Sequence, residues 1–162
     1  MISINNLPKK RISDYQELVD PALYEEIVAT ANELKNRSIL HVNATGYGGG
    51  VADILQSLVP LLNDLGLKAA WQVIEGTTEF FSVTKYLHNS LQSGKKFELN
   101  KKKRELYEKI NFENALKFDS NYDLVVIHDP QPAALPYFLP ENETNFLCRL
   151  HIDTSACHQE NW

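Results

Sequence analysis

Residues 38–66 read SILHVNATGYGGGVADILQSLVPLLNDLG, and this stretch decides the fold. A short apolar run ends at Asn43, three consecutive glycines occupy positions 48–50, and an amphipathic pattern follows from Val51. The pattern predicts a strand, a glycine-rich turn and a helix. Glycines let a ligand come close to the backbone, and the first amides of a helix have no partner within it. The stretch therefore predicts an anion site, and phosphate is the usual anion at such a place.

The glycine spacing departs from the two common nucleotide motifs. A P-loop requires Lys and then Ser or Thr after its last glycine, where this chain has Val51 and Ala52. The dinucleotide spacing G-x-G-x-x-G, counted from Gly46, places Val51 at the third glycine. Glu75 follows the next predicted strand, where an acidic residue binds ribose in nicotinamide enzymes. A nicotinamide-dependent oxidoreductase therefore stays open as an alternative.

The composition is that of a folded, acidic protein. The 162 residues are 43% hydrophobic and carry a formal net charge of -5. This content is sufficient for one domain with a hydrophobic core. The acidic balance argues against non-specific binding of nucleic acid, which requires clustered positive charge. No apolar run has the length of a membrane span, and the first residues lead into no signal peptide. We expect a cytoplasmic protein with neither nucleic-acid nor membrane partners.

Cysteines and histidines near the carboxyl end are of the residue types that bind metals. The candidates are Cys148, His151, Cys157 and His158. If residues 145–152 form a strand, Cys148 and His151 point to opposite faces and cannot share a metal. Two cysteines also make no disulfide framework. We therefore expect no metal, and no motif supports magnesium.

Strand patterns alternate with helical patterns along the chain. Residues 1–20 form an arm without a clear period, and residues 21–162 form one domain whose first helix is capped by Asp20. Apolar runs predict strands over residues 39–42, 68–74, 122–127 and 145–150. Because such strands pair in parallel through crossovers, we expect an open, mostly parallel, Rossmann-like α/β sheet with helices on both faces. Pro60 predicts a kink or a local break in the helix that follows the glycines.

Polar or glycine clusters follow all four predicted strands. They are residues 43–50, 75–76, 128–131 and 151–153. Since parallel strands end at the same edge of a sheet, these clusters should meet in one cleft. Carboxylates suit a sugar because each accepts hydrogen bonds from several hydroxyls. The convergence predicts a site for a polyhydroxylated molecule that carries phosphate. For the histidines taken singly the alternative is structural, with His128 and His151 as hydrogen-bonded supports of the sheet end, and for His88, within a helix, a structural role is the expected one.

Several motifs in combination resemble a known family. They are HVNAT at 41–45, GGGVA at 48–52, WQVIEG at 71–76, FFSVTK at 80–85, HN at 88–89, HDPQP at 128–132 and RLHID at 149–153. This combination is similar to the amino-terminal domain of trehalose synthases of the glycosyltransferring type. These enzymes are retaining GT-B glycosyltransferases. The resemblance runs from about the first helix to the last residue.

The resemblance implies transfer of glucose from a nucleoside diphosphate glucose to a second glucose, which gives trehalose. The nucleotide sugar is a co-substrate, and no cofactor is implied. Gly48, Gly49 and Gly50 would approach the donor diphosphate and the reacting sugar. Asp129 would bind acceptor hydroxyls and His151 would lie at the reaction centre, so these two are the implied catalytic residues. Supporting or sugar-contacting roles would belong to Glu75, Gln131, Arg149 and Asp153.

The resemblance also implies a partner domain. The family has two Rossmann-like domains, and the second binds most of the nucleotide, whereas this chain ends at Trp162. We expect the carboxyl-terminal domain to be the missing partner and the chain alone to be inactive, because half of the groups that stabilise the diphosphate are absent. A homodimer stays open. The alternatives are a trehalose phosphorylase, another retaining sugar transferase on this fold, or a non-catalytic sugar-binding module.

Overall fold

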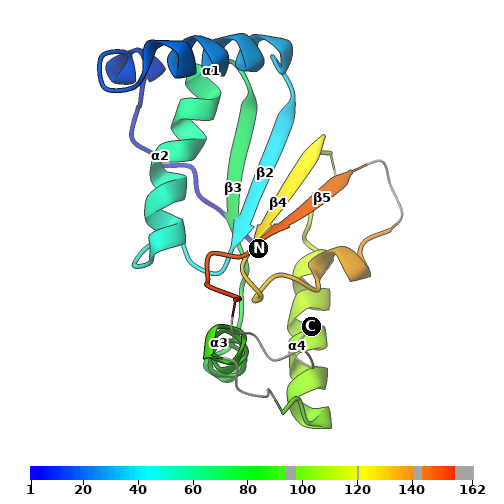
Figure 1. Cartoon of the computed structure of the whole chain (residues 1–162). Helices are drawn as coiled ribbons and strands as arrows, with labels where there is room; N and C mark the ends of the chain where they lie inside the picture. The colour runs from blue at the N-terminus through cyan, green and yellow to red at the C-terminus, as the bar shows by residue number, and fades with distance from the viewer. Residues whose placement is uncertain (94–97, 120, 141–143, 156–162) are drawn as a thin grey trace.

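The computed structural model describes residues 1–93, 98–119, 121–140 and 144–155. Within this part of the chain, five strands form one sheet in the order β1-β3-β2-β4-β5 (Figure 1). The strands are β1 (Ile2–Ser3), β2 (Ser38–Asn43), β3 (Lys68–Val73), β4 (Leu124–His128) and β5 (Asn145–Arg149). Strand β1 pairs antiparallel with β3, and every other pairing is parallel. The expected mostly parallel α/β sheet is confirmed.

Helices cover both faces of the sheet (Figure 1). One face packs against α2 (Gly50–Asp64), where Leu55 and Val59 bury Trp71 of β3. The other face packs against α3 (Thr78–Ser93), α4 (Lys101–Ala115) and the 3-10 helix η2 (Leu135–Phe138), which bury Leu40 and Ile127. These two apolar clusters are the core. Their formation follows from the sequence, since the strands are apolar on both sides.

Two expectations about helices have different outcomes. Helix α1 (Pro21–Glu33) begins as predicted, because Asp20 Oδ1 accepts the backbone N–H groups of Ala22 and Leu23 at 2.9 and 3.2 Å. Of the kink or local break expected at Pro60, the break is wrong, because α2 continues from Gly50 to Asp64 with Pro60 inside it, and the kink stays a prediction. Burial of Val59 beside the proline holds the helix on the sheet despite the lost hydrogen bond.

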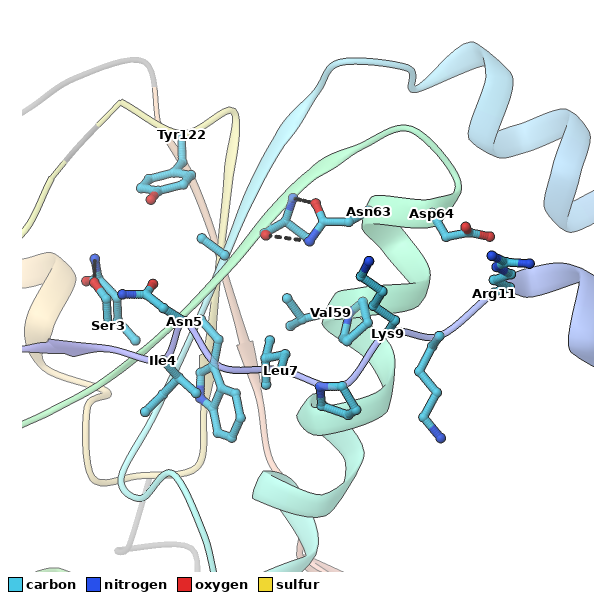
Figure 2. Close-up of a pocket in the computed structure, with 17 residues that line it drawn as sticks. Ser3, Ile4, Asn5, Leu7, Lys9, Arg11, Val59, Asn63, Asp64 and Tyr122 are labelled. Carbon is cyan, nitrogen blue, oxygen red and sulfur yellow. Dashed lines mark hydrogen bonds between the residues drawn. The ribbon is translucent and has the colours of Figure 1, made fainter.

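The arm of residues 1–20 closes the outer edge of β3. It contains β1 and the 3-10 helix η1 (Ile12–Tyr15), and the N–H of Ile4 donates to the carbonyl of Trp71 at 2.9 Å. Further along the edge, the Asn63 side chain makes two hydrogen bonds to the backbone of Ala69. Asn63 Nδ2 donates to the carbonyl of Ala69 at 3.0 Å, and Asn63 Oδ1 accepts the N–H of Ala69 at 2.8 Å. Figure 2 shows this amide of α2 facing the strand, among residues that line a pocket. The pocket lies under the arm and has a volume of about 640 Å³. The amide therefore replaces a strand partner.

The opposite edge of the sheet is β5. Among the described residues, no strand pairs with its outer side, and Leu147 is 51% exposed there. Figure 1 shows β5 as the outermost strand beside β4. No helix in the described part of the chain has the length and apolarity to cross a bilayer.

Candidate functional site

The candidate site lies at the point in the sheet where the strand order reverses. Strand β2 is flanked by β3 on one side and by β4 on the other, so the segments that leave β2 and β4 diverge. In α/β sheets, ligands bind at such a switch point, beyond the carboxyl ends of the strands. A cleft of about 430 Å³ lies there, lined by Asn43, Ala44, Thr45, Gly49, Gly50, Val51, Ala52, Ile54, His88, His128, Asp129, Gln131 and His151.

The glycine-rich turn brings the start of α2 to this cleft. Gly49 is the N-cap of the helix and makes no side-chain hydrogen bond. The carbonyl of Gly49 accepts the N–H of Asp53 at 3.0 Å, which is the first hydrogen bond of the helix. Gly48 has a φ of +71°, which only glycine adopts at no cost. Cβ atoms added at Gly49 or Gly50 would meet nothing within 4 Å. Packing therefore does not require these two glycines, and the free amides and open space suit an anion.

Asn43, at the end of β2, fixes the start of the glycine-rich turn. Its Oδ1 accepts from Trp71 Nε1 at 2.8 Å, and its Nδ2 donates to the carbonyl of Thr45 at 2.8 Å. The side chain is 3% exposed. Buried, fully bonded amides of this kind hold a loop in one position.

Asp129 joins the ends of β4 and β5. Its φ is +64°, and its backbone N–H donates to the carbonyl of Arg149 at 3.0 Å. Its Oδ1 accepts the backbone N–H of His151 at 2.8 Å. The carboxylate thus positions the backbone of His151 with one oxygen, and its other oxygen has no partner among the described residues.

Helix α4 supports the segment that carries Asp129 and Gln131. Tyr107 Oη donates to the carbonyl of Pro130 at 2.7 Å, and Asn111 Nδ2 donates to the carbonyl of Gln131 at 3.2 Å. Gln131 Oε1 is buried and has no partner among the described residues. Because an unpaired buried acceptor is costly, a hydroxyl donor from a ligand would stabilise it.

Three imidazoles form a row that ends in the cleft. His41 Nδ1 lies 3.0 Å from His128 Nε2, and His128 Nδ1 lies 2.8 Å from His151 Nε2. Burial lowers the pKa of His41 to about 4 and that of His128 to about 3, and the charge of Arg149 also lowers both. The two inner rings are therefore neutral at pH 7.

Comparison with known proteins agrees with the geometry. A family model described as the N-terminal domain of trehalose synthase matches residues 41–162, which include both sides of the cleft. The chain belongs to this trehalose synthase family. It is 47% identical over 155 residues to a trehalose synthase of Pyrococcus horikoshii and 48% identical over 154 residues to one of Thermococcus litoralis.

The match covers most of this chain and part of each relative. It includes 95% of the chain against the Pyrococcus horikoshii trehalose synthase and 94% against that of Thermococcus litoralis, but 37% of each of these two proteins. A trehalose phosphorylase of Pleurotus pulmonarius is more distant, at 26% identity over 156 residues, with 88% of the chain and 21% of that protein covered. The expected relation to trehalose synthases is confirmed.

Within this trehalose synthase domain, most residues proposed for the site lie together. Gly49, Gly50, Asp129, Gln131 and His151 line the cleft. Gly48 is exposed in the same turn beside it. Their contacts with substrate stay predictions, but their convergence, which the sequence could predict only from the parallel sheet, is present in the structure.

Three other proposed residues lie outside the cleft lining. Glu75 is bonded to the amino group of Met1 at 2.6 Å and to Lys117 Nζ at 2.7 Å, and these contacts lower its pKa to about 2. Arg149 is exposed on β5, and exposed Asp153 accepts the N–H of Ser155 at 2.9 Å. Glu75 thus has a structural role in this chain, and the sugar contacts proposed for all three stay untested.

The structure places in the site residues for which the sequence predicted no individual binding role. Asn43 and Thr45, from the predicted cluster 43–50, line the cleft together with His88, and His41 lies behind it through the imidazole row. His88 is in a helical pattern and His41 is inside a strand, where a structural role is the usual one. The family motifs at 41–45 and 88–89 are the available signals, because the spatial relation depends on which strands are neighbours.

Proposed function

We propose that this chain is the acceptor-side half of a trehalose synthase, which transfers glucose from a nucleoside diphosphate glucose to glucose with retention. The observation that carries the proposal is the meeting of Gly49, Asp129 and His151 at one switch-point cleft, in a chain of the trehalose synthase family. An anion cradle beside a carboxylate is the arrangement that a sugar diphosphate and a sugar acceptor require.

Each group in the cleft has a task in this reaction. The amides at the start of α2 would bind the donor where its charge develops, which is the main way to lower the barrier. The free oxygen of Asp129 and Oε1 of Gln131 would accept hydrogen bonds from hydroxyl groups of the acceptor glucose. These bonds would orient the attacking oxygen. In a front-face transfer the leaving phosphate takes the acceptor's proton, so no carboxylate nucleophile is needed. Asp129 therefore acts as a binding and orienting group.

The complete reaction needs groups beyond these residues. The chain spans 37% of the length of the Pyrococcus horikoshii and Thermococcus litoralis trehalose synthases that it matches. We place the nucleotide-binding groups in a second domain and expect the 162 residues alone not to catalyse transfer. Incubation of the chain with UDP- or ADP-glucose and glucose tests this, with product analysis by chromatography. Trehalose formed at a rate typical of enzymes would refute it.

Binding to the isolated chain tests the site directly. Titration of the ¹⁵N-labelled chain with glucose should shift the amides of Asp129 and His151, and a nucleoside diphosphate should shift those of Gly49 and Gly50. Xylose, which is glucose without its hydroxymethyl group, is a matched ligand control. Shifts confined to other surfaces would refute the proposed site.

A trehalose phosphorylase is the second candidate, supported by the distant relative of that name. Phosphate would then occupy the cradle of α2 in place of the donor diphosphate. This chain joined to the proposed second domain and incubated with trehalose and phosphate would release glucose 1-phosphate if this candidate is correct, and a synthase would require a nucleoside diphosphate instead. A sugar-binding module without catalysis would bind glucose in calorimetry but catalyse neither reaction.

A further inference from the structure

The row of His41, His128 and His151 connects the interior to the cleft. His41 projects from β2 and is 5% exposed, His128 ends β4 and is 1% exposed, and His151 follows β5 and lines the cleft. The ring centroids are 5.2 and 5.1 Å apart, and both links join ring nitrogens at hydrogen-bond distance. The row therefore crosses three neighbouring strands of the sheet.

Hydrogen-bond accounting leaves two proton arrangements for the row. Each link needs one N–H and one lone pair, and a neutral imidazole has one of each. His128 is in the middle, so its donor can face only one neighbour. In the first arrangement, His41 Nδ1–H donates to His128, and His128 Nδ1–H donates to Nε2 of His151. In the second, all three rings are reversed, and His151 Nε2–H donates inward.

The inner end of the row distinguishes the two arrangements. His41 Nε2 is buried and has no partner among the described residues. The first arrangement leaves a bare lone pair there, whereas the second leaves an N–H group without an acceptor. In the protein backbone, unpartnered buried N–H groups are rarer than under-satisfied acceptors, and we apply the same order to this ring. The buried end of the row therefore favours the first arrangement.

We infer that His41 and His128 are positioning residues that hold His151 as the neutral tautomer protonated at Nδ1. Nε2 of His151 is then occupied by the N–H of His128. The remaining ring nitrogen is a hydrogen-bond donor, so His151 binds an oxygen of the ligand and does not act as a general base. This role deepens the proposed function, because a sugar or phosphate oxygen is the acceptor it suits.

The backbone of His151 is fixed independently of its ring. Its N–H donates to Asp129 at 2.8 Å, while the ring is held from the other side by His128 at 2.8 Å. Two anchors on one residue leave little rotational freedom to the imidazole. The tautomer and the direction of the donor are thus set before any ligand arrives, which is how preorganised sites gain efficiency.

Long-range ¹H–¹⁵N NMR of the labelled chain at pH 7.5 tests the inference, since protonated and bare ring nitrogens have well-separated shifts. We expect Nδ1 to be protonated and Nε2 bare in all three histidines of the row. His41→Phe should remove the donor to His128 and shift His151 toward the Nε2–H form that free histidine prefers. Val126→Ala, on the strand beside His41, is the matched control for packing and should leave His151 unchanged.

Two results would overturn the inference. One is a wild-type His151 that is protonated at Nε2 or at both nitrogens. The other is a folded His41→Phe variant with an unchanged His151, and the wild-type spectrum alone decides the matter if this variant does not fold. The spectra need no ligand, so they remain decisive even if the chain binds neither glucose nor nucleoside diphosphate, an outcome that would count against the proposed function only.

Discussion

The carboxylate of Asp129 accepts the backbone N–H of His151 at 2.8 Å, so the ends of β4 and β5 are joined by a side chain that also lines the cleft. Asp129 reaches this position with a φ of +64°. Asparagine tolerates such a backbone and offers the same acceptor, whereas alanine does neither. This relationship separates the structural role of the residue from its role in binding.

We expect Asp129→Asn to keep the free energy of unfolding within about 0.5 kcal/mol of wild type, because the bond to His151 persists. Asp129→Ala should lose about 2 kcal/mol from the hydrogen bond and the strained backbone together. Both variants should bind glucose several-fold more weakly, since the charge is gone. Urea unfolding and calorimetry measure the two effects, and equal loss of stability in both variants would contradict the assignment.

Variants of the glycine-rich turn can likewise separate a role in stability from a role in ligand binding. Gly48→Ala should cost about 1–2 kcal/mol, because its φ is +71°. Gly49→Ala should leave stability nearly unchanged, since its Cβ would meet nothing within 4 Å, yet weaken nucleoside diphosphate binding at least tenfold. Thermal melts and titration calorimetry test this pair. Undiminished binding by a folded Gly49→Ala chain would argue against close approach of an anion there.

Stability should fall as the pH is lowered below 6.5. Above that pH His41 and His128 are neutral in both the folded and the unfolded chain. Between pH 6.5 and about 4, the lowered pKa values of both residues mean that the unfolded chain binds protons that the folded chain excludes. Each residue can then remove up to about 1.4 kcal/mol per pH unit. The lowered pKa values of Glu75 and Asp123 add losses of the same sign at lower pH.

Urea midpoints at pH 7.5, 6 and 5 measure this dependence. His41→Phe should make the urea midpoint depend less on pH, because only His128 of the two buried histidines then takes up a proton in the unfolded chain and not in the folded chain. Val126→Ala should lower all midpoints in parallel. A wild-type midpoint that does not change between pH 6.5 and 5 would show that the inner rings accept protons in the folded chain.

The amide of Asn63 should contribute measurably to stability. Asn63→Ala removes both bonds to Ala69, and Asn63→Asp keeps one acceptor but places an oxygen against the carbonyl of that residue. We expect each to cost about 1–2 kcal/mol. Ser57→Ala, on the same helix, should stay within about 0.5 kcal/mol of wild type. A neutral Asn63→Ala variant would mean that water replaces the amide without cost.

The strand, turn and helix of residues 38–66 could be predicted because their signals are local. The convergence of Asp129 and His151 followed from one further rule, that parallel strands end at a common edge. The imidazole row could not be predicted, since it requires β4 to lie beside β2, and strand order does not follow from chain order. The pairing of β1 and of the Asn63 amide with the edge of β3 could not be predicted either. A strand of two residues and a single side chain are too short to leave a pattern in the sequence.

The two borders of the sheet differ in how they meet solvent. Backbone groups on the β3 side are occupied by the arm and an amide, whereas in the described part of the chain no strand pairs with the outer side of β5, and Leu147 is exposed. An uncovered border of this kind is a template for intermolecular strand addition. Concentrated preparations of the chain should therefore self-associate along β5, and a gatekeeper charge such as Leu147→Lys should keep them monodisperse.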